Sequence, residues 1–281
     1  MPLFAPNIAA MKEKRDLAGL LMVLKGKDAR AREQAAMALG ELGARSTVSA
    51  IAEMLLAPDI QLAERMSAAE ALGMIKDKAA VGALVEASTR SRERERADID
   101  AAMESPDREY SINFYVNRIA ADESTLRSAI AIALGRIGGE RGIRALFDIL
   151  ASEDGRMADS VKSDVRNSIA DALAREGQGF IPLACEELKH SSMEVRRWAA
   201  HCLGDLGGEQ AVTALIATVY DEHEDFDVRE AAMRGLGNIG DRRAIPYLED
   251  LLHSGNRSVV RDAHAALIGI RQRLPKPPEE N

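Results

Sequence analysis

Apolar and small residues recur at helical spacing within one stretch that the chain repeats seven times. The clearest copy, residues 194–207, reads Glu-Val-Arg-Arg-Trp-Ala-Ala-His-Cys-Leu-Gly-Asp-Leu-Gly. Its apolar positions follow the i, i+3, i+4 pattern of an amphipathic helix, and its final glycine is suited to ending that helix. The same frame fits residues 31–43, 64–75, 126–138, 165–177, 228–240 and 260–270. Each copy therefore predicts one short helix.

The copies are evenly spaced. Their Leu-Gly slot holds Gly40, Gly73, Gly135, Ala174, Gly204, Gly237 and Gly269, at intervals of 33, 62, 39, 30, 33 and 32 residues. The interval of 62 holds two periods, and a degenerate copy is predicted there at about residues 88–121. A second apolar segment follows each glycine, so one unit is a helix, a turn and a helix. One such pair cannot bury both of its faces, and the pairs must stack into a solenoid.

An arginine follows the Val slot in every copy. The seven positions are Arg32, Arg65, Arg127, Arg166, Arg196, Arg229 and Arg261. We interpret them as a structural ladder that pairs with acidic residues or turn carbonyls between repeats, since guanidinium groups form strong charge-assisted hydrogen bonds. We do not interpret them as an anion-binding row.

This pattern resembles the HEAT-like repeats of the phycobilisome-lyase type over residues 16–271. The resemblance implies an all-α superhelical solenoid of seven recognisable repeats plus the degenerate one. We predict a lead-in at residues 1–16, a single solenoid at 17–271 and a disordered, Pro-rich tail at 272–281. Proteins with such repeats include binding scaffolds, bilin lyases, a metal-dependent hydroxylase and DNA-repair glycosylases, so the fold does not select a function.

Charge and composition narrow the class of partner. The formal net charge is −8, which disfavours binding to nucleic acid or to an anionic membrane. No run of 18 apolar residues and no signal-peptide core is present, so we predict a cytoplasmic protein; the lyase-type repeat suggests a bacterial one. Cys185 and Cys202 are predicted to be small buried apolar side chains, with a disulfide or redox pair as the alternative.

The sequence lacks the usual signatures of catalysis. It has no Walker A, G-x-S-x-G, C-x-x-C or H-E-x-x-H motif, so we predict no catalytic, cofactor or metal site. The resemblance to the hydroxylase would require repeated His-Glu pairs in the first helices. Here the single His-Glu pair, His223-Glu224, lies in a connecting segment, residues 220–227. Metal binding by this acidic segment is an alternative, and a solvated turn is our prediction.

Three other segments interrupt the regular pattern. Residues 88–107 carry charges of both signs at i, i+4 spacing and predict a solvated helix. The aromatic residues Tyr110, Phe114 and Tyr115 either pack the degenerate repeat or form an exposed binding edge. Residues 151–164 are predicted to protrude as a loop, either functional or a tolerated insertion.

The variable positions of the repeated helix are four residues apart and lie along one stripe. In the related solenoids this helix lines the concave surface, so we expect it to do so here. The first copies place Glu and Met on the stripe, and the later copies place Arg beside Trp, the residue types enriched at binding hot spots. The candidate partner-binding residues are Met37, Glu41, Met66, Glu70, Met74, Arg136, Arg175, Arg197, Trp198, His201, Asp205, Arg234 and Asn238.

We therefore predict a non-catalytic scaffold that binds a protein or peptide on its concave face, with no cofactor. The alternative is a bilin lyase or a lyase-subunit-like protein. In that case Arg197 and Arg234 would bind the propionates of a tetrapyrrole, and Asp205 would lie near its pyrrole nitrogens. A third hypothesis, nucleic-acid binding, predicts salt-dependent retention on DNA. The sequence leaves the oligomeric state open.

Overall fold

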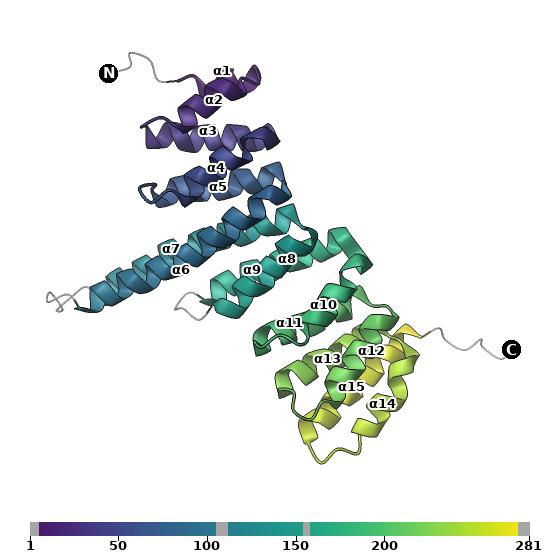
Figure 1. The fold of residues 1–281 in the computed structure, drawn as a ribbon. Helices are drawn as coiled ribbons and strands as arrows, with labels where there is room; N and C mark the ends of the chain where they lie inside the picture. Colours follow the sequence, from purple (N-terminus) through teal and green to yellow (C-terminus); the bar gives the residue numbers. More distant parts are fainter. Residues whose placement is uncertain (1–5, 105–111, 154–157, 275–281) are drawn as a thin grey trace. The chain divides into compact units, whose positions relative to one another are not determined.

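A computed structural model describes residues 6–104, 112–153 and 158–274. Within them every regular element is an α-helix or a short 3-10 helix, and successive helices form antiparallel pairs (Figure 1). The predicted all-α solenoid is confirmed. The chain divides into two compact units, residues 1–172 and 173–281, and each is described by itself.

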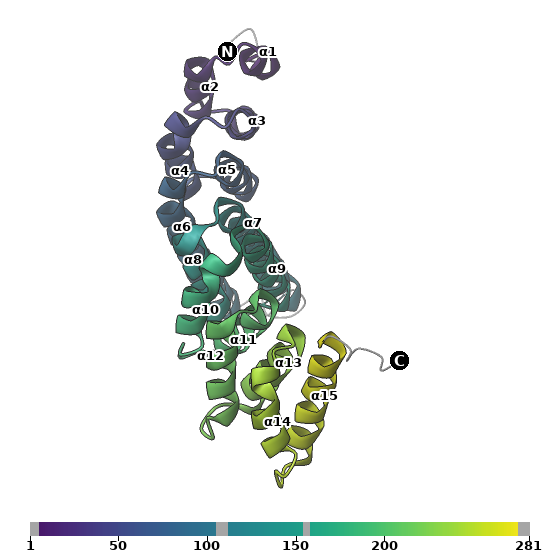
Figure 2. The ribbon, with the colours of Figure 1, turned by 90° about the vertical axis from the view of Figure 1, so that its right-hand side faces the viewer.

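The first unit consists of two rows of helices (Figure 2). The row of first helices, which carry the repeated stretch, contains α3 (Ala29–Glu41), α5 (Leu62–Ile75), α7 (Ile112–Ile137) and α9 (Ala158–Glu176), whose last turn passes the unit boundary. The row of second helices contains α2 (Leu17–Leu24), α4 (Val48–Leu56), α6 (Val81–Glu104) and α8 (Gly139–Ser152). Short 3-10 helices at Arg45–Thr47 and Lys78–Ala80 connect the first helix to the second within a pair. The predicted lead-in forms a helix of its own, α1 (Ile8–Glu13), capped by the Asn7 side chain.

The second unit repeats this arrangement. Its first helices are α11 (Met193–Leu206), α13 (Phe226–Ile239) and α15 (Arg257–Arg273). Its second helices are α10 (Ile181–Glu187), α12 (Glu209–Tyr220) and α14 (Ile245–Leu251), with 3-10 helices at Gly177–Phe180 and Arg242–Ala244. The seven copies of the repeated stretch are thus the seven first helices α3, α5, α7, α9, α11, α13 and α15.

Adjacent first helices approach at the Leu-Gly slot. A Cβ placed on Gly40 would lie 2.7 Å from the Ala71 Cα, and one on Gly204 would lie 2.5 Å from the Gly235 Cα. Glycine at the Leu-Gly slot therefore allows neighbouring first helices to pack closely. The sequence pattern did not predict this role. The later glycine ends the helix as predicted: Gly240 caps α13 with a φ of 75°, a conformation that costs glycine no Cβ clash.

The expected degenerate repeat takes a different form. Residues 81–104 are one continuous helix, α6, and residues 112–137 are another, α7, so the extra length forms a long hairpin rather than a separate helix pair. Residues 81–104 contain no proline, and Gly82 stands in the first turn, so nothing interrupts the helical hydrogen bonding. Likewise, residues 158–164 of the predicted loop belong to α9.

The charged segment of this hairpin is only partly solvated, which corrects our prediction for the described part, residues 88–104, of the segment 88–107. One face of α6 packs on α7, and there Glu95 is 6% exposed. Arg127 of α7 is 1% exposed; its Nη2 lies 2.8 Å from a Glu95 oxygen and its Nε lies 2.9 Å from Glu153 Oε1. Burial raises the pKa of Glu153, and the charge of Arg127 opposes that rise. One guanidinium thus joins the buried sides of α6, α7 and α8.

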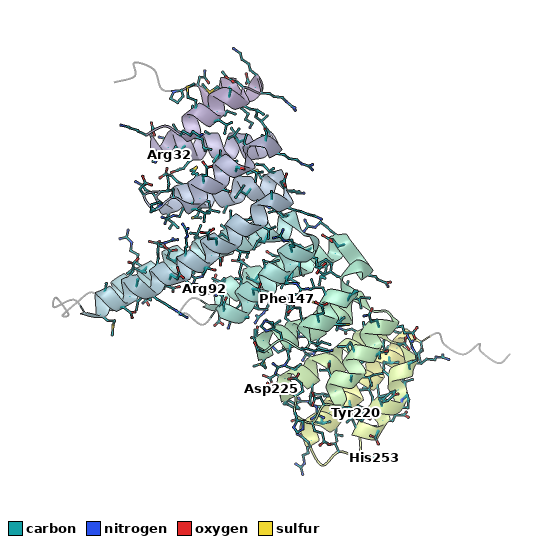
Figure 3. The ribbon with its side chains drawn as sticks, in the orientation of Figure 1. Arg32, Arg92, Phe147, Tyr220, Asp225 and His253 are labelled. Atoms are coloured by element: carbon teal, nitrogen blue, oxygen red, sulfur yellow. The ribbon has the colours of Figure 1, made fainter. Side chains whose placement is uncertain are left out.

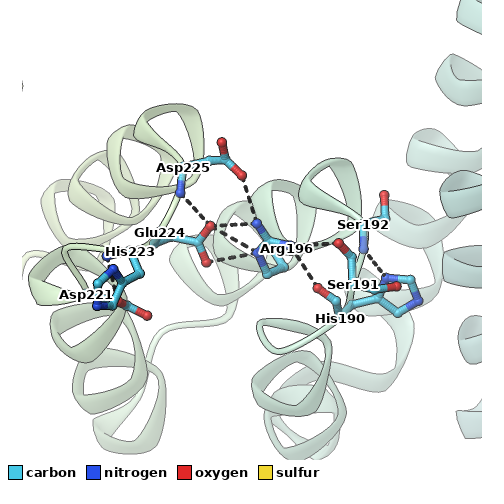
Figure 4. A network of polar contacts seen from close by, with 8 residues as sticks. All are labelled: His190, Ser191, Ser192, Arg196, Asp221, His223, Glu224 and Asp225. Carbon is cyan, nitrogen blue, oxygen red and sulfur yellow. Dashed lines mark hydrogen bonds and ion pairs between the residues drawn. The ribbon is translucent and has the colours of Figure 1, made fainter.

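The repeated arginines form the predicted ladder. Arg196 donates from Nε and Nη2 to Glu224 at 2.8 to 3.0 Å and from Nη1 to the carbonyls of His190 and Ser191 (Figure 4). Arg32, labelled in Figure 3, likewise donates to Glu64 at 2.5 Å and to the Gly26 carbonyl at 2.7 Å. Each of these arginines holds the turn before its own helix and an acidic residue of the next repeat.

Other ladder positions vary this scheme. Arg65 donates to the carbonyls of Ala57 and Pro58, and Arg229 donates to the carbonyl of Val219 at 2.9 Å. In the last helix Arg261 pairs with its neighbour Asp262. The acidic segment 220–227 supplies two of the ladder's partners, Glu224 and Asp225.

Several remaining predictions concern single segments. Cys202 is buried and Cys185 half-buried, both as free thiols, and burial raises the pKa of each. Tyr110 and the side chains of Phe114 and Tyr115 lie outside the described residues, as do residues 275–281 of the predicted tail. In the described part of the chain, no helix combines the length and the apolar character needed to cross a membrane.

Candidate functional site

The candidate site is the exposed side of the first helices, which we call the first-helix face. None of its thirteen candidate residues is buried. Seven are exposed, namely Glu41, Glu70, Arg136, Arg175, Asp205, Arg234 and Asn238, and the other six are half-buried. The residues between them, such as Ala35, Leu39 and Ala68, are buried in the core. The spacing of four therefore separates an outward stripe from the packed side of each helix.

In the first unit the face carries carboxylates beside methionines. Glu70 of α5 lies 4.0 Å from Arg136 of α7, so the structure brings these two candidates together across neighbouring repeats. Glu41 of α3 pairs with Lys12 of α1. Met66 and Met74 are half-buried on α5, where their flexible side chains can adapt to a partner.

In the second unit, α11 carries Arg197, Trp198, His201 and Asp205. The rings of Trp198 and His201 have centroids 5.4 Å apart and are tilted by 53°, a favourable aromatic arrangement. Arg197 donates to Glu194 at 2.7 Å. Its guanidinium is thus held on its own helix and remains about one-third exposed, at 35%.

Arg234 and Asn238 line a cavity of about 220 Å³ between α13 and α15. Arg234 Nη2 donates to Glu230 Oε1 at 2.6 Å. The opposite side of the cavity is formed by Asp262, Ala265 and Arg273 of α15, and the floor by Gly237, Ala266 and Gly269. The first-helix face of the second unit is therefore hollowed at this point.

Sequence reasoning missed Asp262 and Arg273 at this cavity. Asp262 occupies the first position of the outward stripe in the last copy, equivalent to Glu33 in the first. Extending the stripe by one more helix would have found it. Arg273 follows the last copy of the repeat, and no pattern marks it.

A second cavity, of about 540 Å³, lies on the other row, between α10 and α12. Its lining includes Cys185 of α10, Leu188 directly after that helix, and Ala214 and Ala217 of α12. Because burial raises the pKa of Cys185, its thiol is a weak nucleophile at neutral pH. This cavity contains none of the candidate residues.

No group of three or more His, Cys, Asp or Glu side chains in residues 6–104, 112–153 and 158–274 is arranged to hold a metal ion. The first-helix face carries charged side chains of both signs, the amide of Asn238 and flexible methionine side chains. Such a surface is suited to binding an extended partner.

The sequence profile of HEAT repeats matches this chain over residues 17–104 and 181–268, which is more than half of its length. The two matched segments include helices from both units. They contain the first helices α3, α5, α11 and α13 in full and most of α15.

Individual relatives match shorter segments. A segment of 60 residues is 52% identical to the bilin biosynthesis protein PecE of Mastigocladus laminosus and covers 21% of this chain and 22% of that protein. A segment of 67 residues is 45% identical to the phycocyanobilin lyase subunit alpha of a Picosynechococcus species and covers 24% of each chain. The matches therefore span less than a quarter of the length of these relatives.

Among solved structures, the complex of CpcE and CpcF of phycocyanin lyase from a Nostoc species aligns with 93% of this chain and 90% of that chain. Its sequence identity is 22% and its TM-score is 0.38. Human deoxyhypusine hydroxylase aligns with 94% of this chain and 88% of that chain, at 16% identity and a TM-score of 0.38.

Proposed function

The chain belongs to the HEAT-repeat family, and we propose on that premise that it is a binding protein of the bilin-lyase-subunit kind, which holds a partner polypeptide on its first-helix face. One observation carries the proposal. The thirteen candidate residues are exposed or half-buried on the first helices of each unit, whereas the residues between them build the core. A solenoid of stacked repeats presents such a surface for extended ligands.

The relatives favour the lyase-subunit kind over an unrelated scaffold. Local identities of 52% and 45% to PecE and to the lyase subunit alpha are high for repeats whose structure constrains only part of each helix. The name of the second relative describes one subunit of a larger enzyme.

The capture of a partner from an extract of the source organism tests this proposal. The variant Glu41→Lys/Glu70→Lys reverses two exposed charges on the first-helix face, and we expect it to weaken partner binding by about tenfold or more, since charge mismatch at an interface disrupts docking. The matched variant Glu53→Lys/Glu86→Lys makes the same change on exposed residues of the second helices α4 and α6. It should bind as the unaltered protein does.

Both variants should fold, because exposed ion pairs such as Lys12–Glu41 and Arg90–Glu86 contribute at most about 1 kcal/mol each. Circular dichroism checks this. Equal binding by the two variants would place the partner elsewhere, and loss only in the second-helix variant would reverse the assignment of the face.

A second candidate function is binding of a tetrapyrrole by this chain itself, which the identity to PecE favours. The cavity of about 220 Å³ is smaller than the roughly 300–1,000 Å³ of ligand pockets. A bilin on the first-helix face would therefore lie along the open surface near Arg197, Asp205 and Arg234. Absorbance titration with phycocyanobilin separates the candidates: saturable spectral change that Arg197→Ala/Arg234→Ala abolishes supports this function, and an unchanged spectrum rejects it.

A further inference from the structure

The cavity between α10 and α12 has the size of a small-molecule site. Its volume is about 540 Å³, within the roughly 300–1,000 Å³ of ligand pockets. Both helices belong to the second unit and to its row of second helices, which stands opposite the row that carries the first-helix face (Figure 2). An occupant of this cavity would therefore not compete with a polypeptide on the first-helix face.

The wall of the cavity is mostly apolar. Leu188 is buried there, and Ala214 and Ala217 present only methyl groups. Thr213 and Thr218 also line the cavity, but each donates its hydroxyl hydrogen to a carbonyl of its own helix at 3.0 Å. These hydroxyls have no second hydrogen to donate to an occupant.

The thiol in the wall is uncharged. Burial raises the pKa of Cys185, and the nearby charge of Lys189 opposes that rise. Since an unperturbed thiol has a pKa of about 8.5, the Cys185 thiol is protonated at neutral pH. It therefore acts as part of the apolar wall.

The charged side chains at the cavity offset one another. Lys189 and Asp221 carry opposite charges. Both oxygens of Glu224 accept hydrogen bonds from Arg196, at 2.8 to 3.0 Å, and the Glu224 side chain is 9% exposed (Figure 4). Gln210 adds a neutral amide that can both donate and accept. A charged ligand would lose hydration here without a net attraction in return.

We propose that this cavity binds one neutral, largely apolar small molecule. Its apolar body would lie on Leu188, Ala214 and Ala217, and one neutral polar group would hydrogen-bond to the Gln210 amide. An apolar wall with few polar groups is the usual form of a small-molecule site. This inference goes beyond the proposed function, because it adds a second ligand on the other row of helices.

The test is a fluorescence titration of the full chain with three probes that share one apolar body. Pyrenebutanol is neutral, pyrenebutyrate carries a carboxylate and pyrenebutylammonium carries a cation. The pyrene emission reports transfer from water to an apolar environment. We expect saturable binding of pyrenebutanol and about tenfold weaker binding of both charged probes, because their charges would be desolvated without compensation.

Two variants with the same added ring locate the binding site. Ala217→Phe places a phenyl ring in the cavity from an exposed position and should weaken pyrenebutanol binding by about tenfold or more. Ala265→Phe places the ring in the smaller cavity between α13 and α15, also from an exposed position, and should leave the binding unchanged. Circular dichroism checks that both variants fold.

Alkylation of Cys185 by N-ethylmaleimide gives a second readout in the unaltered protein. Cys185 is half-buried at the cavity, whereas Cys202 is 2% exposed. At about ten times its Kd, pyrenebutanol would occupy about nine-tenths of the cavities and should slow the alkylation of Cys185 about tenfold. Mass spectrometry of the digested protein distinguishes the two cysteines, and alkylation of Cys202 would report unfolding instead.

Four results would overturn the proposal: no saturable change with pyrenebutanol, tighter binding of either charged probe, undiminished binding by Ala217→Phe, or alkylation of Cys185 that a saturating probe does not slow. If Ala217→Phe lowers the thermal stability, the alkylation of the unaltered protein decides the outcome. None of these measurements involves the partner polypeptide, so they leave the proposed function of the first-helix face untouched.

Discussion

Replacement of Arg127 by methionine is expected to destabilise the protein by about 3–5 kcal/mol, the largest effect of any single change considered. The guanidinium is 1% exposed and is the cation for two buried carboxylates, Glu95 and Glu153, at 2.8 and 2.9 Å. Its loss would remove the cation that lies between these two buried negative charges. Urea unfolding followed by circular dichroism measures the change, and hydrogen exchange should show it in α6, α7 and α8.

The matched control is Arg118→Met on the same helix. Arg118 has a side chain that is 68% exposed, and it lies 3.9 Å from Asp122, so its removal should alter stability by no more than about 0.5 kcal/mol. The triple variant Arg127→Met/Glu95→Gln/Glu153→Gln removes the stranded charges and should recover part of the loss. A cost below about 1 kcal/mol for Arg127→Met would show that the buried cation does not hold the hairpin.

Replacement of Gly204 by alanine is expected to cost about 1–3 kcal/mol, although alanine is the better helix former. The added Cβ would lie 2.5 Å from the Gly235 Cα, and a backbone atom in a packed helix cannot yield as a flexible side chain can. The helices α11 and α13 would have to separate, which exposes their shared core. Urea unfolding again measures the effect.

The same substitution at Gly82, Gly82→Ala, is expected to raise the stability instead of lowering it. Gly82 lies in the first turn of α6, is exposed, and a Cβ there would meet no atom within 4 Å. Alanine should therefore stabilise the helix by roughly 0.5–1 kcal/mol. If Gly204→Ala were as stable as the unaltered protein, the slot glycines would not be required for helix packing.

The regular part of the fold could be predicted because the same pattern of apolar and small residues recurs in seven copies. Each copy places apolar residues on the face that must pack, so all seven first helices were found from periodicity. The arginine ladder could be predicted for the same reason, since a charged residue that recurs at one structural position indicates a recurring partner. Its particular partners, such as Glu224 for Arg196, depend on how the turns fold and are not visible in the pattern.

The long hairpin shows where periodicity fails. The degenerate copy predicted at about residues 88–121 is equally compatible with continuous helices, because a spacing of about one period does not require a turn. The burial of Glu95 could not be foreseen either. Its partner Arg127 is 32 residues away in the sequence and looks like any other member of the ladder.

The candidate site was predictable as a surface and not as a set of contacts. The spacing of four identifies which residues face outward, and the structure finds none of the thirteen buried. It does not show that Glu70 meets Arg136, or that α13 and α15 leave a cavity beside Arg234, because both depend on how closely neighbouring helices approach.

Photo-cross-linking in extract of the source organism tests the central claim, that the partner lies on the first-helix face. A photoreactive phenylalanine analogue would replace Glu70 or Arg234 on that face. It would replace Glu53 or Tyr247 on the second helices, where Tyr247 is 46% exposed and pairs with Tyr220. We predict cross-links to one polypeptide from the first two positions and none from the others. Cross-links from Glu53 or Tyr247 alone would contradict the account.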